Sequence, residues 1–260
     1  MSIATRDLLI TAVLSVVISA VTLAGLSLVP ASAWDAMRPA TCLPTACFCE
    51  APLLTESIRQ PVNAVSSLAY VLSGAWILVT AGQIAAGVLF GVGHRIIMGL
   101  SAIVIGVGST YYHGSLTFAG QFFDILGMYL FAALLLIYAL QRLYRWSFTT
   151  TALVYIAFNV TLTLVQIGVP DTRRYVFGIV LALALLAEAV VWRVLRPIRT
   201  YAWFWAGIGV FAVAMVVWAL DLSAALCDPS SLIQGHAIWH VLGAVAVFCT
   251  WKWHASEPAP

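Results

Sequence analysis

Apolar runs of about 20 residues recur along the whole chain, and each is long enough to cross a hydrocarbon core about 30 Å thick. The runs are continuous and do not alternate, so they predict helices and not the strands of a membrane barrel. Only 8% of the 260 residues are charged, against roughly 25% in a soluble domain. We therefore expect an all-α integral membrane protein, whose helices satisfy their own backbone hydrogen bonds in lipid.

Eight candidate membrane spans follow from these runs. They cover residues 8–29, 62–82, 95–112, 118–140, 149–169, 175–192, 202–220 and 236–251. We expect residues 62–252 to form a core of seven helices and residues 253–260 to form a cytoplasmic tail. Residues 34–61, the longest connection, could fold over the external mouth of the bundle as a lid.

Residues 1–33 allow two interpretations. Arg6 precedes the first apolar run and Ala31-Ser32-Ala33 follows it, an arrangement that also resembles a signal peptide with its cleavage site. The run is longer than the about 7–15 residues usual for a signal peptide. We therefore favour a retained N-terminal helix over a cleaved signal.

The basic residues set the orientation of the helices. Eight of them fall on one side of the predicted spans and four on the other. The first group is Arg6, Arg95, Arg142, Arg145, Arg193, Arg196, Arg199 and Lys252, and the second is Arg38, Arg59, Arg173 and Arg174. This asymmetry predicts both termini in the cytoplasm. Compact loops favour a prokaryotic plasma membrane, although an endomembrane location is compatible. No basic tract suggests a nucleic-acid partner, and no protein partner can be inferred.

Five polar residues interrupt the apolar runs near their predicted external ends: Ser109, His113, Asp124, His236 and His240. His236 and His240 are four residues apart and share one helix face. Ionisable groups inside a membrane are costly and usually functional. Three imidazoles with an open fourth position are typical of a catalytic zinc site, and the absence of thiolates favours zinc over softer ions.

Alternative interpretations remain for these residues. A single histidine near a helix end is more often an interfacial residue than a ligand, so the prediction depends on the set converging. Asp124 could orient a histidine from outside the metal's own ligands. Ser109 could hydrogen-bond to its own helix.

The pattern S-x-x-x-H from Ser109, an Asp eleven residues after that His, and H-x-x-x-H near the C-terminus resembles the alkaline ceramidases. The same zinc arrangement is similar to that of the wider seven-helix superfamily, which includes adiponectin- and progestin-type receptors. The resemblance spans about residues 47–252 and includes Cys49-Glu50 and Asn63-Ala-Val-Ser66. It implies that His113, His236 and His240 bind zinc, that Asp124 lies close to the metal, and that Ser109 helps to polarise the scissile carbonyl.

The expected function is zinc-dependent hydrolysis of a linear amide bond within the membrane. The substrate would be ceramide or a related N-acyl lipid, cleaved to a fatty acid and a sphingoid-type amine. Asp124 would act as general base and acid, and Ser109 would donate to the oxyanion. The alternatives are a zinc-containing receptor without turnover, a hydrolase of another lipid, and a transporter with a proton relay. The aromatic residues next to these positions could line the lipid cavity, although packing or an interfacial belt is the more common role of any single ring: Tyr111, Tyr112, Phe122, Phe123 and Trp239.

Eukaryotic alkaline ceramidases also carry a calcium site near the Cys-Glu pair. This chain keeps Glu50, but Cys47, Pro52 and Gln60 fall at or near positions where the family has acidic or amide ligands. Calcium requires six to eight oxygen ligands, so we do not expect a calcium site.

Four of the five cysteines lie on the predicted external side, where thiols tend to pair. We expect a disulfide from the loop before the core to Cys227, with Cys49 as the favoured partner. A second pair of Cys42 with Cys47 is a candidate, and a partly unpaired trio is the alternative. Among the remaining acidic residues, Asp221 is expected to be a cap or a solvated charge in an external loop, and Glu188 to reach the interface or pair locally.

Overall fold

The structure, a computed structural model, describes residues 2–45, 47–83, 88–197 and 201–257. Within these residues the chain is helical, and the only β-type pairing is an isolated bridge between Pro39 and Thr117. The elements are α1 (Ile3–Ser27), α2 (Ala31–Asp35), η1 (Leu43–Thr45), α3 (Pro61–Ser67), α4 (Ala69–Val79), α5 (Val92–Ser115), α6 (Phe118–Tyr144), α7 (Phe148–Gly168), η2 (Pro170–Thr172), α8 (Arg173–Leu195), α9 (Tyr201–Leu222) and α10 (Gly235–Ala255). The predicted all-α class is confirmed.

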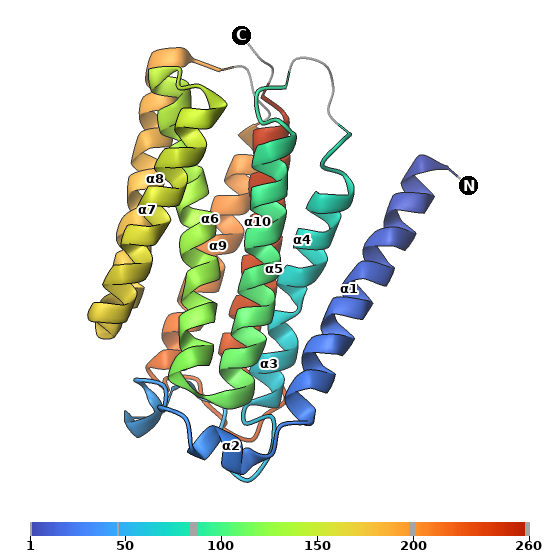
Figure 1. Ribbon diagram of the computed structural model, residues 1–260, viewed down its shortest axis with the longest axis vertical. Helices are drawn as coiled ribbons and strands as arrows, with labels where there is room; N and C mark the ends of the chain where they lie inside the picture. The colour runs from blue at the N-terminus through green and yellow to red at the C-terminus, as the bar shows by residue number, and fades with distance from the viewer. Residues whose placement is uncertain (1, 46, 84–87, 198–200, 258–260) are drawn as a thin grey trace.

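Seven helical segments of the described chain are long and apolar enough to cross a membrane: α1, α3 with α4, α5, α6, α7, α8 and α9. They run side by side along the long axis, as expected of a multi-pass integral membrane protein (Figure 1). The predicted span at 62–82 is broken at Leu68 into α3 and α4. The predicted span at 236–251 lies within α10, which is not among the seven because His236, His240 and Lys252 lower its mean hydropathy.

The bundle has two ends that differ in content. One end holds α2, η1, the α5–α6 turn and the connection from α9 to α10 (Figure 1), and we call it the site end. The opposite end holds the start of α1, the end of α10 and the α6–α7 turn. Arg199 and residues 258–260 of the predicted tail lie outside the described residues.

Helix α1 packs against α4 and α5 at the edge of the bundle (Figure 1). Its polar residues Asp7, Thr11 and Ser15 are buried, whereas most of its apolar residues are exposed. The Asp7 carboxylate accepts a hydrogen bond from the Gln83 side chain. A retained N-terminal helix stays a prediction, and this buried polar face is consistent with it.

A buried ion-pair cluster holds the opposite end together. The Arg142 guanidinium of α6 pairs with Glu188 of α8 and with Glu257, which follows α10. Tyr138 also donates to Glu257, at 3.0 Å. Glu188 therefore pairs across helices, because its position on α8 faces α6 and not its own following turn.

The site depends on a close approach of α5 and α6. Leu116 adopts a left-handed conformation (φ 51°) in the turn between them, and this turn returns the chain directly alongside α5. At Gly108, a Cβ atom would lie 2.5 Å from the Phe123 carbonyl oxygen, so only glycine permits this helix separation. The approach brings Ser109 of α5 next to Asp124 of α6.

Replacing Gly108 with alanine should destabilise the bundle, because the added methyl group overlaps α6 backbone. We expect a loss of about 1–3 kcal/mol, measured as a lower midpoint of thermal unfolding in detergent. Gly209→Ala is the matched control, since nothing lies within 4 Å of its Cβ position. The control should be neutral or stabilising, because alanine favours helix over glycine by about 1 kcal/mol. Equal midpoints for the two variants would contradict the proposed close packing.

Candidate metal centre

Three histidines converge at the site end. His113 lies in the last turn of α5, and His236 and His240 lie one turn apart at the start of α10. All three are buried, and their nearest ring nitrogens lie within 4.8 Å of one another. The structure thus brings together the three residues predicted as metal ligands, on two helices that are far apart in the sequence.

The spacing of His113 and His236 fits two ligands of a tetrahedral zinc ion. The Nε2 atoms of His113 and His236 are 3.2 Å apart, and zinc–nitrogen bonds of about 2.0–2.1 Å at tetrahedral angles would separate two ligands by about 3.3 Å. The His236 Nδ1 atom is buried and has no hydrogen-bond partner among the described residues. Neutral imidazoles with no thiolate form a donor set that suits zinc.

Gln60 fixes the orientation of His113. The Gln60 Nε2 group donates to the Glu50 carbonyl oxygen at 2.7 Å, so its Oε1 atom must face His113 Nδ1, at 2.8 Å. Because an amide oxygen only accepts, His113 carries its proton on Nδ1 and leaves the Nε2 lone pair directed at the cluster. Ordering of a ligand histidine by such a partner is common in metal sites.

His240 is oriented in the same way by α3. Ser66 donates its hydroxyl proton to the Asn63 carbonyl oxygen at 2.9 Å, and its oxygen lies 2.9 Å from His240 Nδ1. The Ser66 oxygen is therefore the acceptor for the Nδ1 proton, and Nε2 of His240 is again left for a ligand. Ser67 supports the same nitrogen at 3.2 Å.

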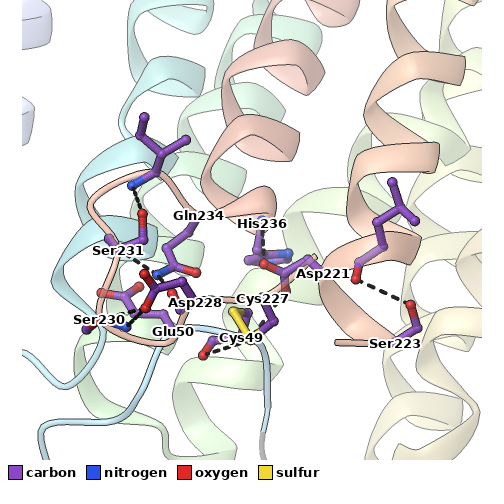
Figure 2. Close-up of a disulfide and its surroundings, with 12 residues drawn as sticks. Cys49, Glu50, Asp221, Ser223, Cys227, Asp228, Ser230, Ser231, Gln234 and His236 are labelled. Carbon is purple, nitrogen blue, oxygen red and sulfur yellow. Dashed lines mark hydrogen bonds between the residues drawn. A yellow bond between two sulfur atoms is a disulfide. The ribbon is translucent and has the colours of Figure 1, made fainter. Parts of the chain in front are cut away.

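Asp221 ties α9, the loop before the core and α10 together (Figure 2). Its carboxylate accepts the backbone N–H of His236 at 3.0 Å and that of Cys49 at 3.2 Å. Asp221 therefore caps α10, which is one of its two predicted roles. It is buried within the last turn of α9 and is not a solvated charge in a loop. The disulfide between Cys49 and Cys227 joins the loop before the core to the connection between α9 and α10 (Figure 2).

Both candidate disulfides are present, because Cys42 also pairs with Cys47.

The Glu50 carboxylate accepts the backbone N–H groups of Val62 and Asn63, each at 2.8 Å, at the start of α3. Burial raises the pKa of Glu50, although these two N–H groups oppose the shift. The Glu50 carboxylate and the Gln60 amide thus both have hydrogen-bond partners within the protein.

Ser109 and Asp124 lie beside the histidine cluster. The Ser109 hydroxyl is 3.3 Å from His240 Nε2 and receives a hydrogen bond from Ser67 at 3.0 Å. The side chains of Ser109 and Asp124 both line the cavity beside the cluster. Asp124 is half-buried and lines the same cavity as His236 and His240. The five predicted site residues therefore occupy one continuous site.

An apolar cavity of 330 Å³ opens from this site, between helices α6 and α8 on one side and α9 and α10 on the other. A second space of 120 Å³ continues it toward the opposite end, and Tyr70, Phe177 and Trp239 line both parts. Trp239 lines the cavity as expected. The other four predicted aromatic residues, Tyr111, Tyr112, Phe122 and Phe123, do not, because they lie on other faces of α5 and α6. Phe48, Phe211 and Trp218 contribute in their place.

The sequence did not single out Gln60, Ser67 or Asp221 as parts of the site. Gln60 immediately precedes Pro61 and the first core helix, and Asp221 ends an apolar run. The sequence signal that the three residues share is a polar side chain at the end of a helix. The histidines that they contact, however, lie at least 15 residues away in the chain.

Gln60→Leu should weaken metal binding, because it removes the acceptor that orients His113. We expect a loss of affinity of about 10- to 100-fold, measured by competition with a chelator. The matched control is Gln166→Leu, which removes an equally buried glutamine that contacts the Phe122 carbonyl away from the cluster. Unchanged affinity in Gln60→Leu would show that His113 is held without it.

Comparison with known proteins places this site in a family. The family model described as Ceramidase matches residues 44–256, which is well over half of the chain and includes the whole metal centre. A search of curated proteins found no match. Membership of that family implies amide hydrolysis and suggests a lipid substrate. The chain thus belongs to the ceramidase family.

Proposed function

We propose that this protein is a zinc-dependent intramembrane hydrolase that cleaves ceramide or a related N-acyl lipid to a fatty acid and a sphingoid-type amine. The single observation that carries the proposal is that the histidine cluster, Ser109 and Asp124 meet at the end of one apolar cavity. A cavity of this volume lies in the range typical of small-ligand sites, about 300–1,000 Å³. Its apolar walls suit an acyl chain.

His113, His236 and His240 would hold the zinc ion. When bound there, zinc would act as a Lewis acid toward the scissile carbonyl. The hydrogen bonds from His113 to Gln60 and from His240 to Ser66 keep both Nε2 lone pairs in place before the metal arrives. We propose no calcium ion, because Glu50 and Gln60 already bind the α3 backbone, the Glu50 carbonyl and His113.

Asp124 would act as the general base and then as the general acid. Its half-buried carboxyl faces the cavity from α6, where it could accept that proton and pass it to the leaving amine. Ser109 has one hydroxyl proton, which it can direct to Asp124 or to the carbonyl oxygen of the substrate. In the second case, the Ser109 hydroxyl would donate to the developing oxyanion.

The cavity also suggests how the lipid would lie. Its apolar extension past Tyr70 and Phe177 would take the acyl chain, and the amide would sit at the histidine cluster. Phe48, from the loop before the core, stacks on His236 with ring centres 3.6 Å apart and would exclude water. Residues 34–61 would therefore act as a lid. The distribution of basic residues favours the external leaflet of a prokaryotic plasma membrane.

Asp124→Asn should lower kcat for release of fatty acid from an N-acyl sphingoid lipid by about 10²- to 10⁴-fold, because it removes the general base. Metal content should stay unchanged, since Asp124 is not one of the three clustered ligands. Asp171→Asn, which alters an exposed carboxylate near the same end of the bundle, should retain full activity. Full activity in Asp124→Asn would exclude it as the base. Wild-type protein that holds zinc but cleaves no N-acyl lipid would favour a receptor.

A further inference from the structure

An arginine without an acidic partner lies at the mouth of the cavity. Arg174, the second residue of α8, is half-buried and lines the cavity beside the metal centre. Its guanidinium lies 5.7 Å from the Phe48 ring centre and 5.9 Å from that of Trp218. Within the described part of the chain, no carboxylate lies within ion-pair distance of it and no group accepts a hydrogen bond from it.

The neighbouring Arg173 shows the contrast. It is buried, donates to the Pro170 carbonyl oxygen at 3.1 Å and lies 4.0 Å from the Asp171 carboxylate. Its charge is therefore used within the protein. Arg174 points to the other face of α8, where its five N–H groups are available to a ligand in the cavity.

The surroundings of Arg174 make it part of the site. Phe48, which it contacts, is stacked on His236. Arg174 also lines the same cavity as Asp124 and His236. A planar guanidinium binds phosphate or carboxylate through two parallel hydrogen bonds, and the partly desolvated setting strengthens such pairs.

The direction of the cavity determines which part of a lipid reaches Arg174. The apolar extension leads away from the metal centre toward Trp203, Phe204 and Trp253 at the opposite end. If the acyl chain occupies it, the amine-bearing part of the lipid lies on the other side of the amide, at the mouth. That part would meet the guanidinium.

We propose that Arg174 binds an anionic head group, so that the preferred substrates are N-acyl lipids whose amine portion carries a phosphate, sulfonate or carboxylate. This inference rests on the proposed amide hydrolysis and narrows its substrate class. The anion and the guanidinium would pair between the Phe48 and Trp218 rings, which shield the pair from water.

The test compares two lipids that differ only in the head-group phosphate, N-hexadecanoyl sphinganine and its 1-phosphate. Wild type should prefer the phosphate in kcat/KM by about 10- to 100-fold, the range expected for charge-assisted hydrogen bonds. Arg174→Gln should bring this ratio close to one, and Arg174→Lys should retain part of it. Arg38→Gln is the matched control, because Arg38 also lies over an aromatic ring, that of Phe118, but does not line the cavity. It should keep the wild-type ratio.

Binding to chelator-treated, metal-free protein provides a readout that does not depend on turnover. The 1-phosphate should bind more tightly than the neutral lipid to wild type, and Arg174→Gln should remove the difference. Equimolar inorganic phosphate should not displace the lipid. Displacement by it would identify a site for a free anion and overturn the lipid assignment.

The outcomes separate this inference from the proposed function. Equal losses with both lipids in Arg174→Gln, or an unchanged preference, would overturn the head-group role. Absence of hydrolysis of either lipid in wild type would contradict the proposed function, while the binding comparison would still decide whether Arg174 recognises the anion.

Discussion

The structure of the site depends on hydrogen bonds to the outer nitrogens of two buried histidines. An imidazole inside an apolar bundle is costly unless both of its nitrogens have partners. Gln60 and Ser66 accept the Nδ1 protons of His113 and His240, so the inward nitrogens can only be acceptors. The inward side of the cluster then presents lone pairs to one point, and a cation is the partner that satisfies them together.

The rest of the site end holds these partners in position. Gln60 is fixed by the Glu50 carbonyl, and the Glu50 carboxylate is fixed in turn by the first N–H groups of α3. Asp221 joins the start of α10 to the same loop, and the disulfide of Cys49 with Cys227 reinforces this connection. The loop before the core is thus bonded directly to His113 of α5 and, through Asp221 of α9, to the start of α10. A change in the loop would therefore alter the positions of the candidate metal ligands.

The sequence was sufficient to predict the helices and the convergence of the three histidines. Apolar runs place helix ends at known depths, and a spacing of four places His236 and His240 on one face. The apolar runs do not show which face of each helix is turned toward the cavity. Four of the five aromatic residues named as possible cavity lining therefore lie elsewhere. The roles of Gln60 and Asp221 depend on how a loop returns to two helices, which local patterns do not encode. Helix α10 shows the same limit, since its polar ligands lower the hydropathy that identifies a span, yet it lies in the interior of the bundle.

The most direct test of the central claim is the zinc content of the detergent-purified protein, compared with His113→Ala and His240→Ala. These variants remove one candidate ligand from each of the two helices that form the cluster. We expect about one zinc ion per chain in the wild type, as three ligands and an open position imply, and its loss in both variants. Wild-type protein without zinc after purification in its presence, or variants that retain it, would contradict the account.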